Sequence, residues 1–366
     1  MGTSNGKEVP SLVSTSDEAK HGALRRSVAK AFSPTAALAY EPLVDQTLSD
    51  LVSALKRYET VDIAEMLLFY SMDAANRVSF NEPLGCLNSG RDVGGTIQLI
   101  RDRFNHWGWW SSIPIVERLI YRNPVSIRMK RAPSSMAATA ASRLKARMSI
   151  TQNNSNSHPD LLQKFIQANH DDPETLGMTD IVSLLMSTIS GAGDTTATTL
   201  TAVIYNLLTH PDVLERLNLE LVKFSMSDPP SFAEVNSLPL LNAVIKESMR
   251  VFSTPTWPME RKVPSGGVMI SGMHIPEGTS VGCMPAAVHS NPAAFGEDAE
   301  SFNPNRWLEA GENKLREMEA VHLGFSRGRR ACLGQHLAML QMKKVIAVLV
   351  INFKVSFSFL GMYESC

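Results

Sequence analysis

The amino-acid sequence predicts a mainly helical fold with one small β region. Apolar residues recur at roughly helical intervals over several long stretches, which is the pattern of amphipathic helices. Residues 262–284 instead alternate and are broken by Gly-Gly, Ser-Gly and Pro-Glu-Gly, which indicates short strands joined by tight turns. The chain has 366 residues, 44% of them hydrophobic, and is therefore long enough for one large domain or two ordinary ones.

Charge and cysteine usage exclude several classes of protein. The formal net charge is -1 and no long basic run occurs, so nucleic-acid binding is not expected. Residues 1–20 are polar and have no apolar core, which predicts a flexible segment that is neither a signal peptide nor a membrane span. The scattered cysteines match neither a metal finger nor a disulfide framework, and they favour reducing surroundings. They are Cys86, Cys283, Cys332 and Cys366.

Three helices are predicted in the first part of the chain. They cover residues 21–32, 36–58 and 63–80, where apolar side chains repeat at helical spacing. His21 and Arg25 lie four residues apart and therefore share one face of the first helix. By itself, such a pair indicates a solvated basic face.

The next region, residues 81–150, is expected to be irregular. Its first half is rich in Gly and aromatic residues, notably HWGWW at residues 106–110, and on composition alone this is a hydrophobic core segment. Residues 151–160, TQNNSNSHPD, have the composition of a loop.

A long helix is predicted over residues 178–209, with Thr179 or Asp180 as its N-cap. Its middle, SGAGDTTATTL, contains glycines that weaken a helix by about 0.5–1 kcal/mol each relative to Ala. Such a local conflict is often found at functional sites. The alternative is a transmembrane helix, and Asp194 with the density of Thr and Ser argues against it.

Two more helices are predicted over residues 210–224 and 238–252. In the second, Glu247 and Arg250 lie three residues apart on one face. On spacing alone this is an ordinary surface ion pair, worth about a few tenths of a kcal/mol.

The stretch FSRGRRACLG, residues 325–334, places a thiol directly before an apolar helical pattern. A cysteine at a helix start lies at the positive end of the helix dipole, which favours its thiolate, and a thiolate is a soft donor that suits iron. Three neighbouring arginines (Arg327, Arg329 and Arg330) favour an anion or a cofactor that carries acid groups. The alternative is a buried, inert cysteine beside a surface basic cluster.

Phe325, Gly328, Arg330, Cys332 and Gly334 fill every fixed place of the pattern Phe-x-x-Gly-x-Arg-x-Cys-x-Gly. The stretch thereby resembles the haem-binding loop of the cytochrome P-450 superfamily. The resemblance implies that Cys332 ligates the iron of haem b, and that Phe325, Arg330 and Gly334 bind the cofactor.

The middle of the long helix resembles the Gly-x-Asp/Glu-Thr-Thr/Ser element that this family places on the distal face of the haem. Asp194, Thr195 and Thr196 match it, which implies a proton relay through Asp194 and Thr195. The chain departs from the pattern at Ala192, where the family has Gly, and Gly191 stands where Ala or Gly is usual. One added methyl group is expected to narrow the oxygen pocket slightly.

Glu247 and Arg250 resemble the family's Glu-x-x-Arg element, since Glu247 precedes Cys332 by 85 residues. The family's partner arginine lies in a Phe-x-Pro-x-Arg segment, and Arg306 in Phe302–Trp307 matches it. The resemblance implies that Glu247, Arg250 and Arg306 form a structural network on the proximal side of the haem.

The resemblance also assigns roles to residues that are otherwise unremarkable. His21 and Arg25 resemble a helical pair that binds the haem propionates, and Arg261 and Arg330 are implied to do the same. Residues 81–150 form a lid over the substrate in the family. The candidates for lid packing or membrane contact are Phe104, Trp107, Trp109 and Trp110.

The fold that the resemblance implies is a mainly helical triangular domain with a small β region over residues 21–353, followed by an atypical tail over residues 354–366. The chain is similar to filamentous-fungal members, particularly those resembling pisatin demethylase. The implied activity inserts one oxygen atom from O2 into a small apolar organic substrate of secondary metabolism. Electrons are expected from NADPH through a separate NADPH-cytochrome P-450 reductase, because the sequence has no flavin or dinucleotide fingerprint.

Two alternatives remain at this point, a haem-thiolate isomerase, dehydratase or peroxygenase, and an inactive truncated member of the family. Both ends are short compared with the family, so an incomplete N-terminus and C-terminus are expected, with strand edges exposed within residues 263–284. The full-length protein is expected at the cytosolic face of the endoplasmic reticulum membrane, held by an N-terminal anchor that this sequence lacks.

Overall fold

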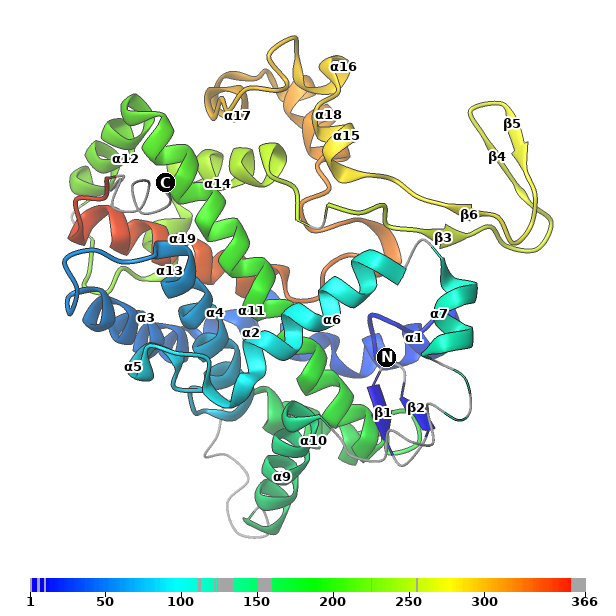
Figure 1. Ribbon diagram of the computed structural model, residues 1–366. Coiled ribbons are helices and arrows are strands. Elements are labelled where there is room, and N and C mark those ends of the chain that lie inside the picture. The colour runs from blue at the N-terminus through cyan, green and yellow to red at the C-terminus, as the bar shows by residue number, and fades with distance from the viewer. Residues whose placement is uncertain are drawn as a thin grey trace, which may run out of the picture. The chain divides into compact units, whose positions relative to one another are not determined.

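The structure is a computed structural model and is mainly helical, with small two-stranded sheets (Figure 1). This agrees with the predicted fold class. The chain divides into two compact units: unit 1 comprises Met1–Ala197 and Leu333–Val345, and unit 2 comprises Thr198–Cys332 and Ile346–Cys366. The structure describes residues 2–4, 7–9, 11–110, 113–121, 123, 125, 134–150, 160–224, 226–254 and 256–356. Residues 151–159 of the predicted loop 151–160, and most of the predicted tail, lie outside the described residues.

Unit 1 is built from helices and one strand pair. Within it, α3 packs against α4 and α5, and α10 contacts both α1 and α4. Its elements are β1 (Gly2–Ser4), β2 (Lys7–Val9), α1 (Glu18–Val28), η1 (Ala29–Phe32), α2 (Pro34–Ala39), α3 (Glu41–Leu55), α4 (Ile63–Phe80), α5 (Cys86–Ser89), η2 (Val93–Gly95), α6 (Thr96–Trp110), α7 (Pro114–Ile120), α9 (Ser135–Ile150), α10 (Leu161–Asp171) and most of α11 (Met178–Thr209).

The helix α4 shows why local sequence determines its limits. The carboxylate of Asp62 accepts hydrogen bonds from the backbone N–H groups of Ala64 at 2.9 Å and Glu65 at 3.1 Å, and this caps the N-terminus. Asn81 ends the helix in the left-handed conformation, with φ of 62°. The predicted range 63–80 is therefore correct.

The single helix predicted over residues 36–58 is instead two helices, α2 and α3, separated at Tyr40. The physical reason is Pro42, which has no N–H to donate and is tolerated only in the first turn of a helix. It stands in the first turn of α3. The phenol of Tyr40 donates to the carbonyl of Ala31 at 3.0 Å, which fixes the corner.

Another expectation for this unit is wrong. The region 81–150 is not irregular but contains α5, α6, α7 and α9. Asp92 accepts hydrogen bonds from the first backbone N–H groups of α6, at 2.9 and 3.0 Å, and the aromatic cluster at its other end hid the helical period. The segment 1–20 contains the antiparallel pair β1–β2, whose connecting dipeptide in the sequence, Asn-Gly, favours two-residue hairpins.

A buried ion cluster joins α3 to α19 (Gln335–Asn352) within unit 1. The ammonium group of Lys344 has no exposed surface and lies 2.5 Å from Glu41 Oε1 and 2.6 Å from Asp45 Oδ1. The two carboxylates are four residues apart on α3 and hence on the same helix face. We call these three residues the Lys344 cluster.

Unit 2 combines helices with two strand pairs. Its small core is formed by Ala243, Phe295, Ala299, Trp307 and Met318. The elements are the end of α11, α12 (Pro211–Lys223), α13 (Phe232–Asn236), α14 (Pro239–Val251), β3 (Arg261–Lys262), β4 (Val268–Ile270), β5 (Met273–Ile275), β6 (Ser280–Val281), α15 (Pro285–His289), α16 (Pro292–Phe295), α17 (Asn305–Glu309), α18 (Glu312–Val321), η3 (Gly328–Arg330) and the end of α19.

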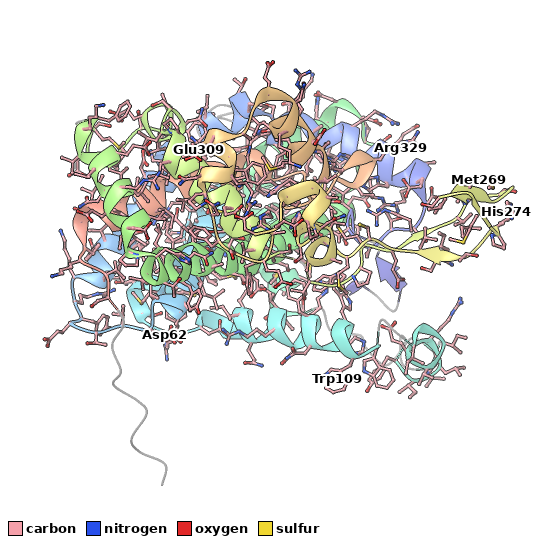
Figure 2. All side chains as sticks on the ribbon, turned by 90° about the horizontal axis from the view of Figure 1, so that it is seen from above. Asp62, Trp109, Met269, His274, Glu309 and Arg329 are labelled. Atoms are coloured by element: carbon pink, nitrogen blue, oxygen red, sulfur yellow. The ribbon has the colours of Figure 1, made fainter. Side chains whose placement is uncertain are left out.

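The strands of unit 2 form two antiparallel pairs, β3 with β6 and β4 with β5. Ser271 and Gly272 join β4 to β5 with positive φ angles of 50° and 80°, as the tightest hairpin loops require. Figure 2 shows Met269 and His274 on this hairpin. Both residues are exposed, so the strands lie at the surface of unit 2.

Candidate functional site

The loop around Cys332 is closed by its own backbone. The N–H of Cys332 donates to the carbonyl of Phe325 at 2.8 Å, and the N–H of Ala331 donates to Gly328 at 3.1 Å around η3. Gly328 has φ of 72°, which a residue with a side chain rarely adopts. The thiol of Cys332 is exposed, so the alternative of a buried, inert cysteine is wrong. The loop thus presents its thiol outward from a fixed backbone.

The segment from Leu333 onward continues this loop into α19. Gly334 accepts the N–H of Ala338 at 2.9 Å, just before the helix begins at Gln335. A Cβ at Gly334 would meet nothing within 4 Å, so the backbone beside it is open to a close approach.

The middle of α11 carries a carboxyl group and a hydroxyl group next to each other in the sequence. Burial raises the pKa of Asp194, and the positive charge of Arg101 opposes this rise. The hydroxyl of Thr195 donates to the carbonyl of Gly191, one turn earlier, at 2.5 Å. Such a bond uses the same carbonyl oxygen as the backbone hydrogen bonds of the helix, and it slightly destabilises the helix at this turn.

The glycine that α11 needs for packing is Gly193, which the motif comparison leaves unassigned. A Cβ at this position would lie 2.2 Å from Sδ of Met72 on α4. By contrast, a Cβ at Gly191 would meet nothing within 4 Å. The predicted N-cap is also corrected, because Thr179 and Asp180 lie inside the first turn and Asp180 accepts the N–H of Gly177 at 3.1 Å.

The helix α1 carries His21 and Arg25. His21 is buried at 3% exposure and Arg25 is half-buried, one turn further along. His21 is therefore not part of a solvated basic face. The helix is capped by Asp17, whose carboxylate accepts the N–H of Lys20 at 3.0 Å.

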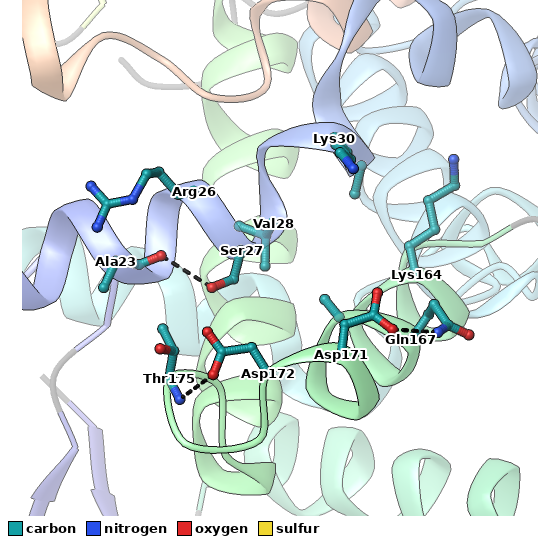
Figure 3. Close-up of a pocket in the computed structure, with 12 residues that line it drawn as sticks. Ala23, Arg26, Ser27, Val28, Lys30, Lys164, Gln167, Asp171, Asp172 and Thr175 are labelled. Atoms are coloured by element: carbon teal, nitrogen blue, oxygen red, sulfur yellow. Dashed lines mark hydrogen bonds between the residues drawn. The ribbon is translucent and has the colours of Figure 1, made fainter.

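A cleft of about 490 Å³ lies beside other residues of α1, between α1, η1 and α10 (Figure 3). Arg26, Ser27 and Lys30 line it from one side, and Lys164 and Asp171 from α10. Neither His21 nor Arg25 is among its lining residues, so this cleft is distinct from the side chains that the motifs single out.

Within unit 2, Glu247, Arg250 and Arg306 lie in direct contact. Arg250 binds the Glu247 carboxylate through two nitrogens, Nε at 2.9 Å and Nη2 at 2.8 Å. Nε of Arg306 donates to the same carboxylate at 3.1 Å. The side chains of the three residues are between 0% and 5% exposed. This is a buried network and not the surface pair that spacing alone indicated.

Two further donors to Glu247 were missed by sequence reasoning. The indole Nε1 of Trp307 donates to Oε2 at 2.8 Å, and the backbone N–H of Asn303 donates to Oε1 at 2.9 Å. Trp307 directly follows Arg306, and this adjacency was an available signal. We call Glu247, Arg250, Arg306 and Trp307 the Glu247 network.

The remaining candidates are also placed. Arg261, on β3, is exposed and donates to the carbonyl of Glu260 at 2.8 Å. Phe325 and Arg330 are half-buried in the Cys332 loop. The candidates are divided between the units: His21, Arg25, Asp194, Thr195 and Gly334 belong to unit 1, and Glu247, Arg250, Arg261, Arg306, Phe325, Arg330 and Cys332 belong to unit 2.

Comparison with known proteins shows which protein family carries these motifs. A family model described as Cytochrome P450 matches residues 4–362. A cytochrome P450 monooxygenase of Aspergillus terreus is 33% identical over 96% of this chain and 74% of its own length. The chain belongs to the cytochrome P450 family. Two further P450 monooxygenases, asR2 of Sarocladium schorii (95% of this chain, 71% of its own) and pkfB of Emericella nidulans (94% and 70%), are each 32% identical to it.

The P450 fold is also found by structure. The crystal structure of the cytochrome P450DA heme domain superposes with a TM-score of 0.77, covering 93% of this chain and 72% of that one, at 22% sequence identity. The predicted family and fold class are confirmed, and so is the prediction of an oxidoreductase of the fungal P450 monooxygenase kind. Among the described helices, none has the length and hydropathy that a membrane crossing requires.

The donor set fits the haem group that this family carries. A metal held by side chains alone needs several donors, and no group of three His, Cys, Asp or Glu side chains suited to a metal occurs among the described residues. Haem brings its own ring nitrogens to the iron and needs one axial protein ligand, such as a thiolate. The exposed thiol of Cys332 meets that need.

Proposed function

We propose that this P450 is a haem-thiolate monooxygenase in which the Cys332 thiolate holds the iron of haem b. The observation that carries the proposal is the Cys332 loop, which closes through the bond from Cys332 N–H to the Phe325 carbonyl and leaves the thiol exposed. When bound, the haem supplies O2 activation, and the thiolate donates electron density to the iron. Phe325 and Gly334 would lie against the cofactor on this side.

Asp194 and Thr195 are proposed to move protons. Burial favours the protonated form of the Asp194 carboxyl, so this group can hold a proton and release it nearby. The Thr195 hydroxyl donates a hydrogen bond to the Gly191 carbonyl, and a hydroxyl group can act both as donor and as acceptor. The support for this proposal is that the carboxyl group and the hydroxyl group both lie in the middle of α11.

Four side chains are proposed to bind the haem propionates: His21, Arg25, Arg261 and Arg330. Charge-assisted hydrogen bonds to carboxylates are roughly twice as strong as neutral ones, so these contacts would orient as well as retain the group. The Glu247 network is proposed to be structural, since its charged groups form hydrogen bonds with one another and with backbone carbonyls.

The finer parts of the function are also proposals. P450 monooxygenases generally use O2 and a redox partner, and here we propose NADPH-cytochrome P-450 reductase and a small apolar substrate of fungal secondary metabolism. The support is the set of similar fungal monooxygenases. The endoplasmic reticulum membrane, at its cytosolic face, is the proposed location.

The experiment that tests the ligand is the spectrum of the reduced, CO-bound protein. Cys332→Ser should abolish the strongly red-shifted Soret band, because a serine oxygen cannot replace the thiolate as donor. Cys283→Ser is the matched control, since Cys283 is another exposed cysteine of unit 2, and it should keep the band. A retained band in Cys332→Ser would refute the assignment.

The relay is tested in the same preparation with reductase and NADPH. Thr195→Ala should keep haem bound but divert reducing equivalents to hydrogen peroxide, because the oxygen-activating step then lacks its proton path. Thr188→Ala is the control, because Thr188 makes the same kind of bond on α11, to the Leu184 carbonyl at 2.9 Å. Equal coupling of NADPH to product in both variants would argue against the relay.

A further inference from the structure

The side chain of His289, at the end of α15, is 1% exposed and bonds to two other segments of unit 2. Its Nε2 accepts the backbone N–H of Leu323 at 2.8 Å. Its Nδ1 lies 2.7 Å from Ser253 Oγ and 3.1 Å from the carbonyl oxygen of Arg250. A backbone N–H can only donate, so Nε2 carries no proton and Nδ1 carries the single proton of a neutral ring.

The surroundings hold the ring in this neutral tautomer. Burial lowers the pKa of His289 to about 4, which is well below neutral pH. The ring stacks on His322, with centroids 5.1 Å apart and planes at 23°, and meets Phe295 edge-on at 6.0 Å. The positively charged form would have to give up the Leu323 bond in this environment.

The position of His289 is fixed from its own backbone as well. Its carbonyl accepts a hydrogen bond from Nη1 of Arg250 at 2.7 Å, which joins the end of α15 to the Glu247 network. From the ring, the bond to Leu323 leads into the turn in which the N–H of Ser326 donates to the Leu323 carbonyl at 2.8 Å. Phe325 lies within this turn, and its carbonyl accepts the hydrogen bond from the N–H of Cys332.

We infer that His289 is a positioning residue for the Cys332 loop. Its unprotonated Nε2 accepts the N–H of Leu323, two residues before the loop of residues 325–334, and so links the segment that leads into the loop to the buried Glu247 network. The inference rests on the proposed function for its catalytic meaning, because positioning a thiol matters to the reaction only if that thiol holds the iron. The hydrogen bond itself can be tested without haem.

Two amide variants separate the two nitrogen atoms of the ring. In His289→Gln the longer side chain can place its oxygen where Nε2 stands, so the Leu323 bond is retained. In His289→Asn the shorter amide can replace only Nδ1, and the Leu323 bond is lost. Hydrogen–deuterium exchange of the full chain, read on peptides covering residues 320–334, should be at least about tenfold faster in Asn than in wild type and within about twofold of wild type in Gln.

A second experiment measures how long the thiolate remains bound to the iron, by following the absorption spectrum. In the reduced, CO-bound form, the red-shifted Soret band should decay several-fold faster in Asn than in Gln, even when the two variants are compared at temperatures equally far below their melting midpoints. A purely structural role would lower the melting temperature alone and leave the two decay rates equal, and equal decay rates would overturn the inference. Loss of the band in wild type would instead refute the proposed function, and the exchange data would still decide the loop contact.

A measurement on unmodified protein covers the case in which Asn does not fold. With ¹⁵N-labelled histidine, the signal absent from His289→Gln identifies His289. It should report protonated Nδ1 and unprotonated Nε2 at pH 7. A proton on Nε2, or a charged ring, would overturn the inference, as would loop exchange in Gln that is ten times faster than in wild type.

Discussion

Two buried ion clusters, one in each unit, are held in different ways. The Glu247 carboxylate has no exposed surface and accepts hydrogen bonds from Arg250, Arg306, Trp307 and a backbone N–H. In the Lys344 cluster it is the cation that has no exposed surface, and its partners Glu41 and Asp45 remain 20% and 28% exposed. The Glu247 carboxylate forms its hydrogen bonds with protein groups, whereas the carboxylates of the Lys344 cluster are also accessible to water.

The difference teaches which charges a folded chain can lose. Removing one partner of a fully buried pair leaves the other charge with fewer hydrogen bonds and with no water to replace those that are lost. Removing the partner of a half-hydrated carboxylate leaves a group that water can reach or that can take up a proton. Burial already raises the pKa of Asp45, against the opposing effect of Lys344. Stability should therefore depend more on the Glu247 network.

The largest effect is expected for Arg250→Ala. It should lower the free energy of unfolding by about 3–5 kcal/mol, because the buried Glu247 carboxylate loses two charge-assisted hydrogen bonds that water cannot replace. Urea unfolding at pH 7 measures this change. The control is Arg316→Ala, whose exposed pair with Glu312 at 3.3 Å should contribute no more than about 0.5 kcal/mol. A loss for Arg250→Ala as small as the control would show that the network is not structural.

A smaller loss is expected for Lys344→Met, about 2–3 kcal/mol, because the stranded carboxylates keep part of their hydration. Urea unfolding is again the measurement. Adding Asp45→Asn to Lys344→Met should recover part of the loss, since the neutral amide removes one unpaired charge. If the double variant is less stable than Lys344→Met alone, the comparison between the clusters is wrong.

The smallest expected effect is that of pH, and it has opposite signs at the two places. His289, which contacts the Glu247 network, has its pKa lowered to about 4, so between pH 6.5 and 4 the unfolded chain binds a proton that the folded chain does not. The contribution of His289 to the free energy of unfolding should fall as pH falls, by about 2 kcal/mol from pH 7 to 5. Asp45 has a raised pKa, so its contribution instead falls as pH rises above 3.8.

Urea unfolding at pH 7 and pH 5, in wild type and in His289→Gln, isolates the histidine contribution. Arg250 and Glu247 act on this group electrostatically in opposite directions, and burial outweighs both. His322, stacked on the ring, also has a pKa lowered to about 4 by burial and by His289. The same pH dependence in both proteins would contradict the assignment of His289 as a neutral buried group.

Sequence predicts best where a local signal settles the structure. The limits of α4 follow from Asp62 and Asn81, and Glu247 and Arg250 could be paired from their spacing on one helix turn. The break between α2 and α3 was missed although Pro42 marks it. A proline is a local signal of a helix start, so this break can be predicted from sequence.

The rest depends on contacts between residues that are distant in the sequence. Lys344 sits in an apolar helix, and its carboxylate partners come some 300 residues earlier, so no periodicity reveals the cluster. The ring of His289 accepts a hydrogen bond from the backbone N–H of Leu323. Because every residue except proline has such a group, a sequence motif cannot reveal this contact. For the same reason the Cys332 motif predicts the family and leaves the support of the loop unseen.

The contact between Gly193 and Met72 has a consequence for how this protein can change over generations. A methyl group at position 193 would collide with a side chain that is itself only 1% exposed and has little room to move. A larger residue at 193 therefore becomes acceptable only after Met72 has been replaced by something shorter. The two positions, on different helices, should vary together among descendants of this chain, with the change at 72 coming first.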